Sequence, residues 1–194
     1  MCSADRPSES PRARADAATL LGVARRSIAS GLETGEPLAL DPSHFALELR
    51  EPRASFVTLR RAGALRGCVG SLEPSRPLVS DIAHNAFGAA FRDDRFPPLD
   101  AWELADLEIG AAILSALEPI LAPDERTLLE RIRPGIDGLV LRCDGRQGTF
   151  LPAVWESLRE PSLFWRELKR KAGVPVDAWS RDWSILRYTV EPLR

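Results

Sequence analysis

The chain has 194 residues, of which 44% are hydrophobic and 28% charged, and its formal net charge is -2. This is the composition of an ordinary globular protein that is long enough to bury a core, and the slightly negative charge argues against sequence-independent DNA binding, which requires a basic surface. No segment approaches the roughly 20 consecutive apolar residues of a membrane-spanning helix.

Cysteine and histidine usage narrows the chemistry further. The three cysteines, Cys2, Cys68 and Cys143, have no CxxC spacing, and their odd number does not form a disulfide framework. With His44 and His84 as the two histidines, no histidine-rich metal centre is expected, and we predict neither a bound metal nor a cofactor. The opening residues lack the apolar run of a signal peptide, so we predict a cytoplasmic protein.

The first segment differs in composition from the rest of the chain. Residues 1–15 are rich in Ser, Pro, Arg and Asp, and we predict a disordered leader there, followed by one domain over residues 16–194. Asp16 is a suitable N-cap for a helix, and Gly31 and Gly35 are suited to its end.

A hairpin and a helix are expected next. Residues 54–61 have the pattern of a strand, and a turn at residues 62–64 leads into a second strand around Cys68. The helix that follows has a strong apolar stripe, and Asp81 and His84 are predicted to project from its opposite side.

The second half of the chain mixes strands and helices. Elements are expected over residues 107–117 (strand), 124–132 (helix), 138–143 (strand), 149–151 (strand), 164–172 (helix) and 183–190 (strand). Asp144-Gly145 is typical of a tight hairpin turn. Hairpins together with scattered helices predict an α+β fold, with a mostly antiparallel sheet and surrounding helices.

The most site-like stretch is Leu65–Gly70, a strand-like run in which two glycines bracket a cysteine. Glycine in a strand marks a bulge or the close approach of another backbone or of a ligand, so Gly67 and Gly70 predict open space beside the thiol. Arg66 and Cys68 would share one face of the strand, and the nearby cation would favour the thiolate.

Cys68 has two interpretations. A free cysteine is most often a small buried hydrophobe that packs in a core. Alternatively, Cys68 is a nucleophile, in which case it needs a base, and His84 is the nearby imidazole in the sequence. The helical phase of His84 also fits a side chain that is simply solvated.

Three charged residues are further candidates. Asp93 and Arg95 form either a structural ion pair at a helix end or a site where Arg95 binds a carboxylate or phosphate through two hydrogen bonds. Glu118 follows the long strand and is either an exposed loop acid or an acid that faces the Cys68 site.

Other motifs exclude several enzyme classes. No GxxxxGK[ST], GxGxxG, HExxH or GxSxG motif occurs. The five tryptophans could form a stacking platform for bases. Trp155, Trp165 and Trp183, however, lie among apolar residues at helix or strand spacing, so we interpret most of the tryptophans as core residues.

The sequence resembles the AMMECR domain family in five segments, which are Leu65–Gly70, Ala89–Pro98, Leu114–Ile120, Gly138–Leu141 and Gly148–Pro152. The resemblance runs in order from about Asp16 to Leu193. The family motif normally has Asp-Pro-Arg-Phe where this chain has residues 93–96, and Asp94 replaces the proline here.

The resemblance implies a larger α+β lobe that contains both termini, a smaller inserted lobe, and a cleft between them near Cys68. It also implies partners, because bacterial and archaeal members resemble "system protein A" of a set that includes a Memo-type protein and a radical-SAM protein. The chain has no CxxxCxxC motif for an iron–sulfur cluster, so radical chemistry would belong to the partner.

Two functional hypotheses follow. In the first, the chain is a cysteine-dependent enzyme whose cleft contains Arg66, Cys68, Asp93 and Arg95 and which acts on a small anionic or modified nucleotide or RNA-base substrate. In the second, it is a non-catalytic binding or adaptor subunit, and the glycine-flanked motif is a groove for a ligand or a partner segment. We favour the second hypothesis, and an unusually reactive Cys68 would favour the first.

Overall fold

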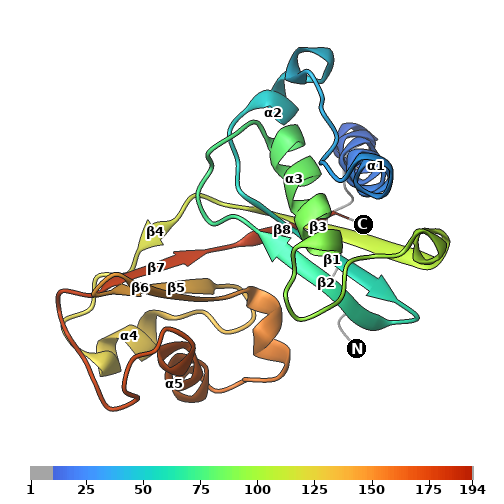
Figure 1. Ribbon diagram of the computed structural model, residues 1–194. Helices are drawn as coiled ribbons and strands as arrows, with labels where there is room; N and C mark the ends of the chain where they lie inside the picture. The colour runs from blue at the N-terminus through green and yellow to red at the C-terminus, as the bar shows by residue number, and fades with distance from the viewer. Residues whose placement is uncertain (1–10, 194) are drawn as a thin grey trace, which may run out of the picture. The chain divides into compact units, whose positions relative to one another are not determined.

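Figure 1 shows the computed structural model, which describes residues 11–193. The chain divides into two compact units: unit 1 takes in the chain up to Ile113 and the residues from Pro192 onward, and unit 2 is Leu114–Glu191. The described residues form two four-stranded sheets with antiparallel pairing and several helices. The predicted α+β fold is therefore confirmed. The cleft expected between two lobes stays a prediction.

The first helix begins earlier than the sequence predicts. α1 (Pro11–Thr34) starts with a proline, which suits the first helical turn because its missing N–H would have no acceptor there. Residues 11–15, which we assigned to the leader, are therefore helical, and Asp16 lies inside the helix instead of capping it. Residues 1–10 of the expected leader lie outside the described residues. The helix ends as predicted before Gly35, whose φ is +75°.

The sheet of unit 1 has the order β2-β1-β3-β8. Its strands are β1 (Ser55–Arg61), β2 (Ala64–Gly70), β3 (Leu107–Leu114) and β8 (Val190–Leu193), and its short helical segments are η1 (Pro42–His44), α2 (Leu47–Arg50) and η2 (Ala101–Asp106). The central strand β1 pairs antiparallel with both β2 and β3. β2 is therefore an edge strand, and its outward N–H and C=O groups need partners from elsewhere.

Helix α3 (Leu78–Phe91) is the centre of the core of unit 1. It contacts α1 on one side and β1 and β2 on the other (Figure 1). Leu78, Val79, Ile82, Ala83 and Ala86 are almost completely buried. A helix that is apolar nearly all round in this way requires burial on more than one side, which the sheet and α1 provide.

The predicted orientation of Asp81 on α3 is wrong. Asp81 is 1% exposed, and its carboxylate accepts hydrogen bonds from the backbone N–H of Ser55 at 2.9 Å and from its hydroxyl at 2.7 Å. The hydroxyl of Ser71 and the side-chain amide of Asn85 donate to the same carboxylate at 2.9 Å. Asp81 thus joins the start of β1 to the residue after β2. The nearby His84 is exposed, as expected.

Unit 2 contains the second sheet, in the order β4-β7-β5-β6. Its elements are β4 (Glu118–Pro119), α4 (Glu125–Arg131), β5 (Gly138–Cys143), β6 (Arg146–Phe150), η3 (Pro152–Glu156), α5 (Pro161–Lys171) and β7 (Ser184–Tyr188). The strand predicted over residues 107–117 ends at Leu114. The predicted turn at Asp144-Gly145 is confirmed, since both residues have the positive φ that a tight antiparallel hairpin needs.

The core of unit 2 lies on one face of this sheet, where Leu139, Leu141 and Cys143 of β5 pack with residues of α5. Trp155, Phe164 and Trp165 are buried, which confirms the interpretation of Trp155 and Trp165 as core residues. Cys143 is also a core residue, and burial raises the pKa of its thiol. Among the residues described, no helix is both long and apolar enough to cross a membrane.

Candidate functional site around Cys68

Cys68 lies in a row of small residues that crosses three strands of unit 1. It is opposite Thr58 of β1, which in turn is opposite Gly110 of β3. Neighbouring residues of β2 pack against α3, with Gly67 beside Ala89. Because successive residues of a strand point to opposite faces of the sheet, Cys68 points away from α3. The predicted alternation holds from Gly67 to Gly70, but a register shift between Leu59 and Arg60 of β1 leaves Arg66 without an opposite residue, so the alternation does not extend to Arg66 and Leu65.

The immediate contacts of Cys68 hold it in place through both its side chain and its backbone. Its Sγ is 3.3 Å from the hydroxyl oxygen of Thr58. Its backbone N–H donates to the Asp93 carboxylate at 2.8 Å, and its carbonyl oxygen accepts a hydrogen bond from Arg95 at 3.3 Å. The two side chains therefore supply, at this residue, the partners that an adjacent strand would give to the edge strand β2.

Asp93 and Arg95 form a bidentate ion pair. Arg95 Nε lies 2.9 Å from Asp93 Oδ1, and Arg95 Nη2 lies 2.7 Å from Asp93 Oδ2. The pKa of Asp93 is well below its usual range, mainly because Arg95 donates hydrogen bonds to the ionised carboxylate. Of the two sequence-based interpretations, the geometry favours the structural ion pair, because the guanidinium fork that would bind an anion is already occupied.

Arg66 is engaged in a second bidentate pair, with Glu103 of η2. Its Nε and Nη2 donate to the two carboxylate oxygens of Glu103 at 2.8 and 2.9 Å. The Glu103 side chain is 7% exposed, and Arg66 lowers its pKa to about 2. The Nη1 of Arg66 is enclosed and has no acceptor among the described residues. Arg66 is thus mostly engaged by Glu103, and it is not the free cation beside the thiol that the sequence suggests.

Sequence reasoning missed Glu103, although a local signal was present. Asp100 precedes η2, and the carboxylate of Glu103 accepts the backbone N–H of Asp100 at 3.0 Å. This hydrogen bond is one of the two that make up a capping box. The sequence signature of a capping box is a capping residue such as Asp followed three positions later by Glu. The pattern gives the place of Glu103 on η2 but not its pairing with Arg66, which depends on how η2 meets β2.

The glycines beside Cys68 do not provide the open space that we predicted. A side chain at Gly67 would place its Cβ 2.0 Å from the carbonyl oxygen of Ala89. A side chain at Gly70 would place its Cβ 2.3 Å from the ring of Phe56. Both glycines permit close packing within unit 1, which is the other meaning of glycine in a strand.

Two candidates remain, His84 and Glu118. His84 is on α3, on the other side of the sheet from the Cys68 thiol, and its Nδ1 is 2.9 Å from the carbonyl oxygen of Ser80. Glu118 belongs to β4 of unit 2, where it is exposed and paired with Arg187 at 3.2 Å. Unit 1 therefore brings Arg66, Cys68, Asp93 and Arg95 to one strand edge without a histidine base.

The open part of this face is a depression lined by both polar and apolar side chains. A cavity of about 370 Å³ is lined by residues that include Thr58, Arg60, Glu108 and Gly110. Arg60 and Glu108 are opposite each other on β1 and β3 and carry opposite charges. Among the described residues, no group of three or more His, Cys, Asp or Glu side chains is placed to hold a metal ion. The face can therefore offer a small depression with a charged margin.

The Arg66–Glu103 pair predicts a pH dependence of stability. The pKa of Glu103 falls from 4.5 to about 2 on folding, so its ionised form stabilises the native state by about 3 kcal/mol above the unfolded pKa. This contribution is lost as the pH falls from about 5 towards 2. Urea unfolding of the wild-type protein and of Glu103→Gln should show a stability difference that is largest near neutral pH and shrinks in acid. A difference that stays constant with pH would contradict this assignment.

Comparison with known proteins decides the family. The AMMECR1 family model matches residues 21–193, which is most of the chain. The chain belongs to the AMMECR1 family. AMMECR1 relatives include a protein of Methanothermobacter thermautotrophicus that is 33% identical over 174 residues, covering 87% of this chain and 88% of that protein. A protein of Methanosarcina barkeri is 38% identical over 162 residues, covering 81% of this chain and 79% of that protein.

A solved AMMECR1-like structure has the same fold. The crystal structure of the uncharacterized protein PH0010 of Pyrococcus horikoshii is similar to this chain with a TM-score of 0.81 and 34% sequence identity. The similarity covers 89% of this chain and 88% of PH0010. The names of these AMMECR1 relatives state no activity, so the chemistry is inferred from the geometry around Cys68.

Proposed function

We propose that this AMMECR1 protein is a non-catalytic accessory subunit, and that the sheet face around Cys68 receives a segment of a partner protein. The observation that carries the proposal is the pairing of the charges next to the thiol. Arg66 is paired with Glu103 and Arg95 with Asp93, and both pairs are bidentate.

The same observation weighs against a cysteine-dependent enzyme. A thiol nucleophile is activated by an adjacent base or by a free cation. Within unit 1, the hydroxyl of Thr58 is the polar side-chain group beside Sγ, and a hydroxyl is not a base at neutral pH. The only imidazole on a neighbouring element, His84, is on the helix behind the sheet. Arg66 and Arg95 instead fix the backbone and the edge of β2.

The shape of the face supports a docked segment. The row Cys68, Thr58 and Gly110 has short side chains, so a partner backbone could approach the sheet closely. Arg60 and Glu108 at the margin would give polar contacts that orient such a segment. At the edge of β2, the backbone N–H and carbonyl of Cys68 are already hydrogen-bonded to Asp93 and Arg95. The partner would therefore lie on the face of the sheet and would not add a strand to its edge.

The proposed partners are a Memo-type protein and a radical-SAM protein, and the proposed location is the cytoplasm. Family membership supports the partners, since related bacterial and archaeal chains resemble a component of a set that contains both. The absence of a disulfide framework in the sequence supports the location. In such an assembly the radical chemistry would belong to the radical-SAM partner.

The test is binding between purified proteins. This chain should form a complex with the Memo-type or the radical-SAM protein encoded in the same genome, measured by sedimentation velocity and titration calorimetry. Gly110→Arg should weaken the complex at least about tenfold, because Gly110 lies in the docking face and a Cβ added there would be 3.9 Å from its nearest neighbour, the carbonyl oxygen of Thr58. Cys68→Ser should leave the affinity within about threefold, because the thiol is not needed for chemistry.

A matched control is Gly22→Arg, since Gly22 is exposed on α1 and also has free space around it. It should bind like the wild-type protein. The proposal is wrong if neither partner binds, or if Gly110→Arg and Gly22→Arg have the same affinity as each other.

A further inference from the structure

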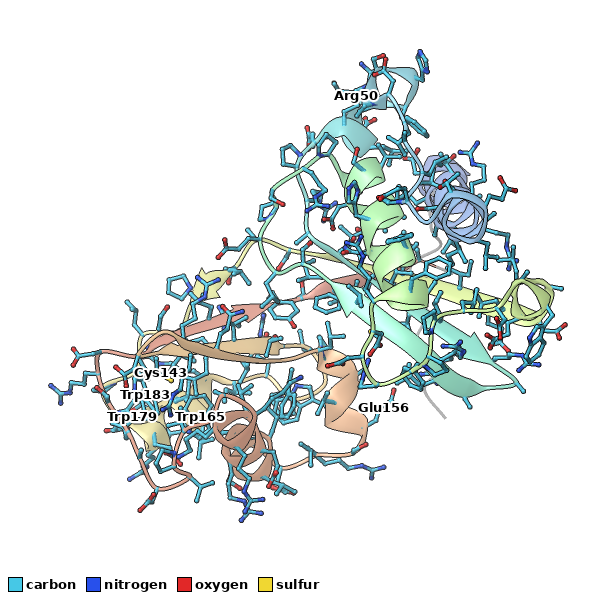
Figure 2. All side chains as sticks on the ribbon, in the orientation of Figure 1. Arg50, Cys143, Glu156, Trp165, Trp179 and Trp183 are labelled. Carbon is cyan, nitrogen blue, oxygen red and sulfur yellow. The ribbon has the colours of Figure 1, made fainter. Side chains whose placement is uncertain are left out.

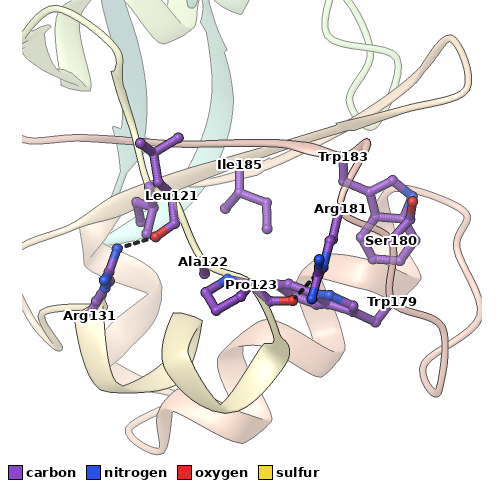
Figure 3. Close-up of a pocket in the computed structure, with 10 residues that line it drawn as sticks. Leu121, Ala122, Pro123, Arg131, Trp179, Ser180, Arg181, Trp183 and Ile185 are labelled. Carbon is purple, nitrogen blue, oxygen red and sulfur yellow. Dashed lines mark hydrogen bonds between the residues drawn. The ribbon is translucent and has the colours of Figure 1, made fainter.

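Unit 2 contains a cavity that the proposed function does not use. It has a volume of about 530 Å³ and lies between the segment that follows β4 and the loop that joins α5 to β7 (Figure 3). Ile120 and Ile185 give it an apolar floor, and Leu121 and Pro123 lie along one side. Cavities that bind small organic molecules have about this size and are mostly apolar with a few polar groups.

Two tryptophans form one wall of the cavity. Trp179 and Trp183 are half-buried and line it, while Trp165 behind them is completely buried (Figure 2). The ring centroids of Trp179 and Trp183 are 6.2 Å apart, and each lies within 6.5 Å of the centroid of Trp165. The interpretation of Trp183 as a pure core residue is therefore incomplete. A rigid wall of indole rings is suited to contact with a planar ring.

The charges that line the cavity are all positive. Arg131 and Arg181 contribute guanidinium groups, and none of the described residues that line it is acidic. Arg131 donates to the carbonyl of Leu121, and Arg181 donates to the carbonyl of Pro123 at 3.3 Å (Figure 3). Neither arginine has a carboxylate within ion-pair distance in the described part of the chain, so most of their N–H donors remain available for an anion.

Three acids lie near the cavity without lining it. Asp182 is between the lining residues Arg181 and Trp183, and its Oδ2 accepts a hydrogen bond from the hydroxyl of Ser180 at 3.5 Å. Asp124 accepts the backbone N–H of Thr127 at 2.7 Å as the cap of α4, and this hydrogen bond is the main cause of its lowered pKa, with Arg181 a smaller one. Glu118 is paired with Arg187, which lines an adjoining depression. The charged groups that line the cavity itself are the two arginines, which favours a negatively charged ligand there.

Hydrogen bonds to neighbouring elements hold the loop that carries Trp179 and Trp183. Lys169 of α5 is 1% exposed, and its ammonium group donates to the carbonyl of Ala178 at 3.3 Å and to Glu125 at 2.8 Å. Ala178 directly precedes Trp179, and Arg181 ties the other end of the loop to Pro123. The cavity wall is thus held in position before a ligand arrives, which lowers the entropic cost of binding.

We propose that this cavity binds a small anion that carries a planar ring, and that a nucleoside monophosphate has the matching chemistry. The ring would contact Trp179 and Trp183, and the phosphate would accept hydrogen bonds from Arg131 and Arg181. This site is independent of the docking face around Cys68, and it involves no reaction.

The experiment is a titration of the purified protein with the nucleoside monophosphates, followed by tryptophan fluorescence and by calorimetry. At least one should bind with a dissociation constant below the millimolar range and quench the fluorescence. The same nucleoside without phosphate, and inorganic phosphate alone, should each bind at least about tenfold more weakly, because each meets only one half of the site.

Paired variants assign the binding to the cavity. The double variant Arg131→Ala, Arg181→Ala should weaken binding at least about tenfold. Arg126→Ala should leave it unchanged, because Arg126 is on the same helix as Arg131, is 89% exposed and does not line the cavity. Circular dichroism confirms that the variants are folded. The proposal fails if no monophosphate binds, if the double variant binds like the wild type, or if a short RNA binds more tightly than every mononucleotide.

Discussion

Gly67→Ala should lower the free energy of unfolding by about 3 kcal/mol or more, or prevent folding. The added Cβ would be 2.0 Å from the carbonyl oxygen of Ala89 and 3.0 Å from its carbonyl carbon. These are backbone atoms of α3, so no side-chain rotation can relieve the clash. The strand and the helix would have to move apart, and α3 is the centre of the core of unit 1. Urea unfolding followed by circular dichroism measures the effect.

The matched control is Gly22→Ala, where a glycine on the exposed side of α1 has nothing within 4 Å of the new Cβ. It should raise stability by about 0.5–1 kcal/mol, because alanine has a higher helix propensity than glycine. If Gly67→Ala were as stable as the wild-type protein, β2 would not pack against α3 as described. Gly67 would then be free for a ligand, as the sequence suggested.

Asp81→Ala should lower the free energy of unfolding by about 4 kcal/mol. The substitution removes the acceptor of four donors, which are the N–H and the hydroxyl of Ser55, the hydroxyl of Ser71 and the amide of Asn85. Ser55 is completely buried and Asn85 almost so, and donors left buried without an acceptor cost more than the net value of the bonds. Asp81→Asn should fall between Asp81→Ala and the wild type.

His84→Ala, on an exposed position of the same helix, should change stability by less than about 0.5 kcal/mol. The comparison of the two variants by urea unfolding separates the polar network from a general effect of alanine in α3. An Asp81→Ala protein with wild-type stability would mean that the network around Ser55 contributes nothing, and the account of how β1 and β2 are joined to α3 would be wrong.

Local patterns predicted the parts of the fold that depend on local structure. The alternation along Gly67–Gly70 placed Cys68 and Gly70 on one face of β2, because the side-chain period of a regular strand does not depend on what it packs against. The register shift at Arg66 interrupts this period and was not predicted. The turn at Asp144-Gly145 was predictable because the positive φ values that it needs restrict the residues found there. The start of α1 was not predictable in this way, because both Pro11 and Asp16 suit the beginning of a helix.

The partners of the charged groups were beyond sequence patterns. Asp81 accepts from Ser55, 26 residues away, and Arg66 pairs with Glu103, 37 residues away. Helical phase alone placed Asp81 on the wrong side, because it says nothing about donors that the sheet brings to the helix. The glycines at positions 67 and 70 fit the approach of either a ligand or protein atoms, and only the position of α3 and of Phe56 decides between these.

The claim that Cys68 is not a catalytic nucleophile is tested most directly by the alkylation rate of its thiol. Iodoacetamide would be applied at neutral pH to the native and the urea-unfolded protein, with Cys2→Ser and Cys143→Ala as the background. A half-buried thiol whose neighbouring arginines are both paired with carboxylates should react at least about threefold more slowly in the native protein than in the unfolded chain. Faster reaction in the native protein would show an activated thiolate and contradict the accessory role in favour of a cysteine-dependent enzyme.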